Sequence, residues 1–100
     1  MMKKEEILDK IIKEIKNLKE FHLKSLGVFG SYVRNEQKEN SDIDILVEFE
    51  QGNLSFDNYM GLKLYLEDLF EIKIDLVIKN DLKEGFKSNI MQEVVYVQGL

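Results

Sequence analysis

Hydrophobic residues change their spacing repeatedly along this chain, from the three- and four-residue intervals of a helix to the runs and alternation of a strand. Residues 4–20 have helical spacing, and their apolar stripe predicts a helix that faces a core. Shorter apolar segments at residues 25–30, 42–49 and 73–79 predict three strands. This alternation predicts a small α/β protein in which helices cover a sheet.

Three further helices complete the predicted order of helix, strand, helix, strand, helix, strand and helix. A short helix is expected over residues 32–37, directly after the first strand. A longer helix over residues 56–70 follows Ser55, a residue type that favours the N-cap position. Residues 82–95 predict the last helix, because apolar residues recur there every four positions, at Phe86, Ile90 and Val94. These patterns leave open whether the strands pair in parallel or in a mixed sheet.

The length and composition favour one folded domain over residues 1–100. Hydrophobic residues make up 44% and charged residues 33% of the 100 positions, which is typical of globular chains and unlike disordered ones. The net charge of −5 argues against a broad nucleic-acid-binding surface. No apolar run approaches the roughly 20 residues that span a membrane, and the first residues lack the apolar core of a signal peptide. We therefore expect a cytoplasmic protein that does not contact a membrane.

Cysteine and histidine contribute little to any metal site in this sequence. The chain has no cysteine and one histidine, His22, which excludes thiolate zinc sites and histidine clusters. His22 precedes the first predicted strand, and this position favours a surface side chain over a general base. Any metal ion must therefore be held by oxygen, which indicates carboxylates and a hard cation such as Mg²⁺.

Asp42 and Asp44 form the first candidate pair of ligands. They are two positions apart on a predicted strand, so their side chains leave the same face roughly 7 Å apart. Like charges at this spacing disfavour each other's ionisation, and a divalent cation held by both would remove the repulsion. A strand with two solvated acids explains the pair equally well, so the pair alone leaves both interpretations open.

Two other features point to the same chemistry. Asp75 lies in an apolar strand, on the opposite face from Ile74 and Leu76, and is either a solvent-facing residue or a third ligand. Gly30 and Ser31 end the first strand, where a glycine lets the main chain approach a ligand and the following N–H groups can bind a phosphate. Similar pairs also end strands in many ordinary turns.

Taken together, Gly30-Ser31, ten intervening residues, Asp42-Ile43-Asp44 and the later Asp75 resemble the nucleotidyltransferase superfamily of the DNA polymerase β type. The small size and the closing segment, residues 90–97, are similar to the minimal nucleotidyltransferases called MntA-like. The resemblance spans nearly the whole chain. It implies an α+β fold with a short mixed β-sheet covered by helices.

The resemblance also implies an activity. Such proteins are typically antitoxins whose partner is a HEPN-domain ribonuclease toxin, and better-understood members add AMP from ATP to a tyrosine of that toxin. By this resemblance Gly30 and Ser31 hold the β- and γ-phosphates of ATP. The three acids, Asp42, Asp44 and Asp75, hold two Mg²⁺ ions and form the catalytic site. Whether Asp75 accepts the proton of the attacking hydroxyl or holds the first ion stays open.

Arg34 is the remaining candidate for nucleotide binding. It is the only arginine of the chain and lies about one helical turn after Ser31, so it could bind triphosphate oxygens with two donors. A solvated surface position is equally compatible with the sequence.

Two alternatives to AMP transfer remain, namely a non-catalytic antitoxin that binds its toxin directly and a nucleotidyltransferase acting on a small molecule or RNA. The sequence also leaves open which base is preferred, and whether the chain assembles with itself or with a partner.

Overall fold

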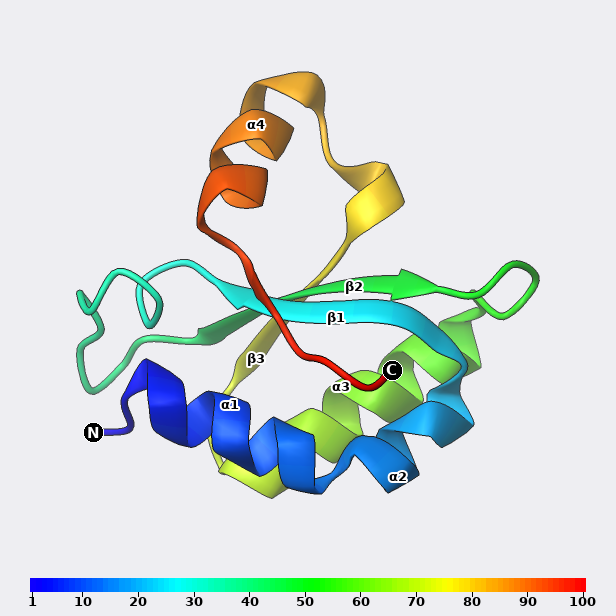
Figure 1. Cartoon of the computed structure of the whole chain (residues 1–100), viewed down its shortest axis with the longest axis horizontal. Helices are drawn as coiled ribbons and strands as arrows, with labels where there is room; N and C mark the ends of the chain where they lie inside the picture. The colour runs from blue at the N-terminus through cyan, green and yellow to red at the C-terminus, as the bar shows by residue number, and fades with distance from the viewer.

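A mixed four-stranded β-sheet crosses the middle of the protein (Figure 1). The computed structural model describes all 100 residues. Strand β1 runs antiparallel to both β2 and β4, whereas β3 is parallel to β2, so the order is β3-β2-β1-β4. The expected α+β fold with a short mixed sheet is therefore confirmed. The strands are β1 (Leu23–Phe29), β2 (Ile43–Phe49), β3 (Ile74–Ile78) and β4 (Val95–Tyr96).

Three helices cover one face of this sheet, namely α1 (Lys4–Lys13), α2 (Ile15–Leu18) and α3 (Phe56–Phe70) (Figure 1). Their apolar side chains bury against alternate residues of the strands, which accounts for the helical and alternating patterns of the sequence. The helix residues with the least exposure in this core are Ile7, Ile11, Leu18, Leu62 and Leu66.

The single helix expected over residues 4–20 is wrong, because the helix is interrupted at Glu14. The main chain of Glu14 leaves the helical conformation, with φ −101° and ψ 10°. Its carboxylate accepts hydrogen bonds from the hydroxyl of Tyr65, on α3, and from the side-chain amide of Asn17. A 3₁₀ turn, η1 (Lys19–Phe21), then leads into β1. A tertiary contact therefore accompanies a break that the continuous helical spacing did not reveal.

Helix α3 has the predicted bounds and the predicted cap. The Ser55 hydroxyl accepts a hydrogen bond from the Asn58 N–H at 3.1 Å, which satisfies one of the free donors of the first turn. At the other end Glu71 adopts the left-handed conformation, with φ 55°, although it is not a glycine. No helix of the protein is both long enough and apolar enough to cross a membrane.

The short helix expected over residues 32–37 is also wrong, because this segment is a turn. The N–H groups of Val33 and Arg34 both donate to the carbonyl of Gly30, at 3.0 and 3.1 Å. Asn35 follows with φ 58°, a left-handed conformation that cannot extend a right-handed helix. The remaining residues before β2 form a loop.

The end of the chain differs from the expected helix over residues 82–95. A 3₁₀ turn, η2 (Lys79–Asp81), leads to α4 (Glu84–Glu93), and Val95 and Tyr96 then pair with β1 as a fourth strand. This pairing depends on Gly27, because a β-carbon there would lie 2.6 Å from the Val94 side chain. Two residues are too few to carry a strand pattern, so the sequence could not indicate β4.

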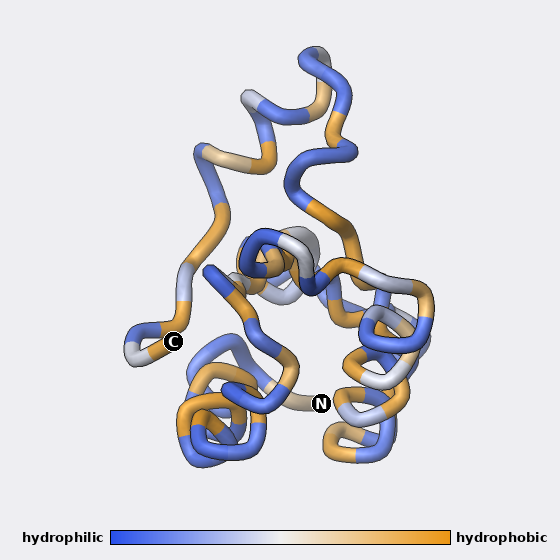
Figure 2. Tube along the Cα trace, turned by 90° about the vertical axis from the view of Figure 1, so that its right-hand side faces the viewer, coloured by the Kyte–Doolittle hydropathy of each residue, from blue (hydrophilic) through white to orange (hydrophobic).

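Helix α4 lies on the side of the sheet opposite α1 and α3 and stands away from the body of the protein (Figure 1). None of its residues is buried, and Phe86 is 66% exposed. Figure 2 shows this segment, at the top of the view, as mainly hydrophilic. The four-residue apolar spacing that predicted this helix therefore does not mark a core face.

Candidate functional site

The candidate carboxylates lie along two neighbouring strands. Asp44 of β2 is the register partner of Asp75 of β3, and parallel register partners direct their side chains to the same face. This face is opposite the main core, to which Ile43, Ile45 and Ile74 belong. Asp42 directly precedes β2, Asp44 is half-buried and Asp75 is exposed. The structure therefore places Asp75 beside Asp44, on the face that the first three helices leave uncovered.

The carboxylate of Asp44 has an unusual protonation equilibrium. Its pKa is raised from 3.8 to about 6, mainly by burial and additionally by the neighbouring Asp75 and Asp42 carboxylates. The positive charge of Arg34 acts in the opposite sense and is the smaller influence. Negative charge is thus concentrated around the half-buried Asp44 carboxylate, and the positive charge of Arg34 does not offset it.

Gly30 is held directly against this carboxylate. It follows Phe29, the β1 register partner of Asp44, and has a φ of +81°. A β-carbon at Gly30 would lie 2.0 Å from Oδ2 of Asp44. Only a glycine satisfies both the backbone conformation and this approach.

Arg34 projects from the turn after Gly30 toward two glutamates. Its Nε donates to Glu36 at 2.8 Å, and its Nη1 donates to both carboxylate oxygens of Glu93, at 2.9 and 3.0 Å. These hydrogen bonds, with that to Glu36 the strongest influence, raise the pKa of Arg34. Glu93 also accepts a hydrogen bond from the Gly30 N–H at 2.6 Å. Sequence analysis did not select Glu93, because it is 63 residues from Gly30 and only the placement of α4 brings the two together.

Tyr32 anchors the segment between Gly30 and Asp42. Its ring is buried, and its hydroxyl lies 3.5 Å from the Ser41 carbonyl. Burial raises the pKa of Tyr32, and the charge of Asp42 adds to this effect. The Ser41 hydroxyl in turn accepts from the Lys38 N–H at 2.8 Å. Ser31 lies in the same turn, immediately after Gly30, where its carbonyl accepts a hydrogen bond from Glu36.

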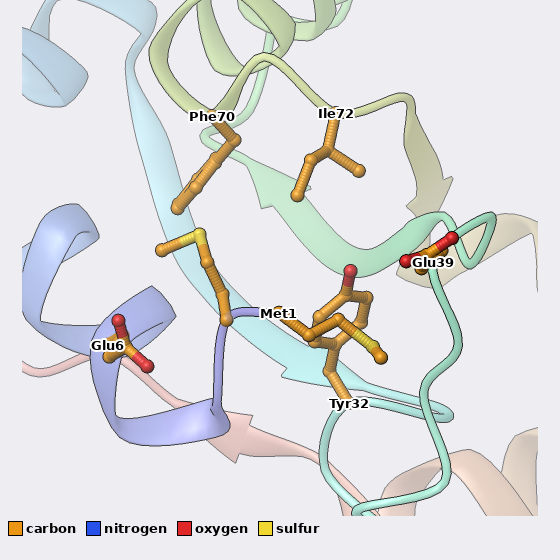
Figure 3. Close-up of a pocket in the computed structure, with 7 residues that line it drawn as sticks. Met1, Glu6, Tyr32, Glu39, Phe70 and Ile72 are labelled. Atoms are coloured by element: carbon orange, nitrogen blue, oxygen red, sulfur yellow. The ribbon is translucent and has the colours of Figure 1, made fainter.

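A surface cavity of about 500 Å³ opens on a different set of residues (Figure 3). Tyr32, Phe70 and Ile72 direct their side chains toward it, beside Met1 at the N-terminus. None of the predicted site residues lines this cavity. The candidate site is therefore the uncovered sheet face and the turn after β1, rather than this cavity.

The donor chemistry of this face suits a hard divalent cation. Asp42, Asp44 and Asp75 offer carboxylate oxygens, the ligand type that Mg²⁺ prefers, and a cation would neutralise the negative charge that these acids bring together. No three Asp, Glu, His or Cys side chains are already arranged around a common point as metal ligands. His22 lies before β1, at the opposite end of that strand from Gly30, and does not contribute.

The chain is similar to known proteins over most of its length. The model of the nucleotidyltransferase domain family matches residues 8–97. The chain is 46% identical over 98 residues to the protein adenylyltransferase MntA of Thermococcus cleftensis, covering 97% of this chain and 98% of that protein.

Two solved structures share the fold. One, described provisionally as a minimal nucleotidyltransferase, is 31% identical with a TM-score of 0.77, over 90% of this chain and 92% of that one. The other, a toxin–antitoxin with AMP-PNP, is 26% identical with a TM-score of 0.73, over 93% of this chain and 73% of that one. The family match covers most of the chain, including every predicted site residue. We conclude that this chain belongs to the nucleotidyltransferase domain family and is an MntA-like minimal nucleotidyltransferase.

Proposed function

We propose that this chain is an antitoxin that transfers AMP from ATP to a tyrosine hydroxyl of a HEPN-domain toxin. The observation that carries this proposal is the pairing of Asp44 with Asp75, with the main chain of Gly30 pressed against Asp44. This arrangement sets two carboxylates beside a turn whose N–H groups can bind phosphate, as transfer of a nucleotidyl group requires.

The relatives support the choice of reaction and partner. The Thermococcus cleftensis relative is named a protein adenylyltransferase, and the 26% identical solved structure is a toxin–antitoxin with AMP-PNP. A protein acceptor and a nucleoside triphosphate are therefore the substrates that we assign to this chain. The toxin is the partner that we expect it to bind.

In this proposal the turn after β1 binds the triphosphate. Main-chain N–H groups at Gly30 and Ser31, with the Ser31 hydroxyl, donate to the β- and γ-phosphate oxygens. Arg34 adds a planar guanidinium that can make two parallel hydrogen bonds to phosphate. The positive φ of Gly30 turns the chain so that this backbone lies beside the carboxylates.

The carboxylates act on the reacting atoms. The tyrosine oxygen attacks the α-phosphorus, the bond from that phosphorus to the bridging oxygen breaks, and pyrophosphate leaves with the electron pair. Asp75 either takes the phenolic proton or shares in holding the metal. Asp42, Asp44 and Asp75 would hold two Mg²⁺ ions, which when bound activate the attacking hydroxyl and neutralise charge on the departing pyrophosphate.

The test is the intact mass of the toxin after incubation with this protein, ATP and Mg²⁺. We expect a mass increase of one or more AMP groups with the wild type and none with an Asp42→Asn/Asp44→Asn variant. Asp81→Asn is the matched control, because Asp81 is an exposed acid of η2 outside the site. Full transfer by the double variant would show that the carboxylate assignment is wrong.

A second candidate is an antitoxin that neutralises its toxin by binding alone. The contact of Glu93 with the Gly30 N–H favours it, because a carboxylate already takes one of the donors that a nucleotide would use. Neutralisation of the toxin by the Asp42→Asn/Asp44→Asn variant separates the two functions. A binding antitoxin retains neutralisation in this variant, whereas an antitoxin that acts by AMP transfer loses it.

A further inference from the structure

The side chain of Glu93 occupies the turn to which we assign phosphate binding. Its Oε2 accepts from the Gly30 N–H at 2.6 Å, and both of its oxygens accept from Nη1 of Arg34. A carboxylate and a phosphate are both anions that bind such donors through two or more oxygens. The two cannot use the same N–H groups at once.

We propose that Glu93 is an internal competitor of the triphosphate, which must leave Gly30 and Arg34 before the nucleotide can bind there. This inference rests on the proposed function, because it takes these donors to be the phosphate site. It assigns to Glu93 a role in setting nucleotide affinity rather than in the chemical step.

The position of Glu93 allows this release. It is the last residue of α4, a helix with no buried residue, and its side chain is 24% exposed. The following Val95 and Tyr96 remain paired with β1, so the side chain can turn away while the sheet stays intact. No apolar core contact of α4 opposes the movement.

Arg34 has a second hydrogen-bond partner, Glu36. Glu36 binds Nε of the guanidinium at 2.8 Å, whereas Glu93 binds Nη1. When Glu93 leaves, Glu36 can therefore keep Arg34 in place while Nη1 becomes free for a phosphate oxygen. The side chain is then oriented before the ligand arrives, which lowers the entropic cost of binding.

A positioning role for Glu93 would have the opposite effect. If Glu93 served to hold Arg34 in a productive orientation, its removal would weaken phosphate binding. If it competes with phosphate, its removal strengthens binding. The sign of the change in affinity therefore distinguishes the two roles.

The experiment compares wild type, Glu93→Gln and Glu36→Gln by titration calorimetry with inorganic tripolyphosphate in the presence of Mg²⁺. Both variants lose one negative charge beside Arg34, but only Glu93→Gln alters the contact with the Gly30 N–H. We expect Glu93→Gln to bind roughly tenfold more tightly, since the variant lacks the charge that strengthens the hydrogen bonds competing with phosphate. Glu36→Gln should change the affinity no more than about twofold, because the glutamine oxygen can still accept from Nε of Arg34 and only an exposed charge is lost.

The ¹H chemical shift of the Gly30 main-chain amide is a second measurement. A purely structural role of Glu93 would not produce the changes in this shift that we expect. In the wild type the Gly30 ¹H resonance should shift when tripolyphosphate replaces the Glu93 carboxylate. Glu93→Ala should show a shifted Gly30 resonance before any ligand is added, and it should also bind tripolyphosphate more tightly. Thermal unfolding of each variant without ligand checks that the fold is retained.

The outcomes separate this inference from the proposed function. If the wild type binds tripolyphosphate and Glu93→Gln and Glu93→Ala bind it equally well or more weakly, the competitor role is wrong while the phosphate site stands. If neither wild type nor Glu93 variants bind it, both the inference and the proposed phosphate site are overturned.

Discussion

Gly30 and Asp44 are packed so closely that a β-carbon on the glycine would lie 2.0 Å from Oδ2 of the carboxylate. Gly30 directly follows β1, whose last residue, Phe29, pairs with Asp44 of β2, and this register brings Gly30 close to the carboxylate. The conformation of the turn at Gly30 and the position of the Asp44 carboxylate are therefore coupled. A change at either residue should affect the other.

Gly30→Ala should lower the free energy of unfolding by about 2 to 4 kcal/mol, because it adds a steric overlap to an unfavourable positive φ. Gly52→Ala is the matched control, since Gly52 has a φ of +83° but nothing within 4 Å of the added carbon. Gly52→Ala should lower the free energy of unfolding by only about 1 kcal/mol. Urea unfolding measures both, and equal losses would mean that the contact with Asp44 contributes nothing.

Asp44→Asn should stabilise the protein at pH 7 in the absence of divalent cations. The folded-state pKa of Asp44 is raised from 3.8 to about 6, so its ionised form disfavours folding. The gain should be about 1 kcal/mol, which allows for solvent screening of this half-buried group. The full gain in the free energy of unfolding should be present above pH 6. It should decrease as the pH falls from 6 to about 4, because the wild-type Asp44 side chain becomes protonated in the folded state. Unfolding curves between pH 4 and 8 test this, with Asp81→Asn as the control. A gain that did not change with pH would contradict the assigned cause.

Mg²⁺ should stabilise the wild type against heat, because a bound cation relieves the repulsion among Asp42, Asp44 and Asp75. At ten times its dissociation constant the gain is about 1.4 kcal/mol, or an increase in Tm of roughly 7 °C for a chain of this size. NaCl at equal ionic strength should not reproduce the increase. Asp42→Asn/Asp44→Asn should not respond to Mg²⁺, and an unchanged response would place the cation elsewhere.

Glu71→Gly should stabilise the protein by about 1 kcal/mol. Glu71 ends α3 with φ 55°, and a glycine adopts this left-handed conformation without the steric cost of a β-carbon. Asp68→Gly, at an exposed position within the same helix, should instead lose about 0.5 kcal/mol through poorer helix propensity. Chemical unfolding of both variants gives the comparison, and a loss at both positions would show that the turn does not favour glycine.

Much of the fold was predictable where local pattern and tertiary structure agree. The apolar spacing of α3 and the Ser55 cap defined that helix, and the bounds of β2 and β3 followed from short β-branched runs. The continuous helical pattern before β1 failed at Glu14, where a contact with Tyr65 from a distant helix accompanies the break. Local spacing contains no information about such a partner.

The candidate site, like the fold, was predictable from the sequence only in part. The types and spacing of Gly30, Asp42, Asp44 and Asp75 were sufficient to select them as candidates, because alternation along a strand fixes which side chains share a face. The register that sets Asp75 beside Asp44 comes from the pairing of β2 with β3. That pairing joins strands separated by a whole helix.

The sequence by itself determined where most of the helices and strands form and indicated the candidate acids and the turn after β1, since these depend on neighbours a few residues apart. Only the tertiary structure decided that Asp44 lies against Gly30, that β4 pairs with β1 at Gly27, and that Glu93 reaches the Gly30 N–H. The physical reason is that these contacts join residues far apart in the chain. Their geometry depends on the register of the strands and on the position of α4 relative to the sheet. Neither the register nor this position is encoded in a local sequence pattern.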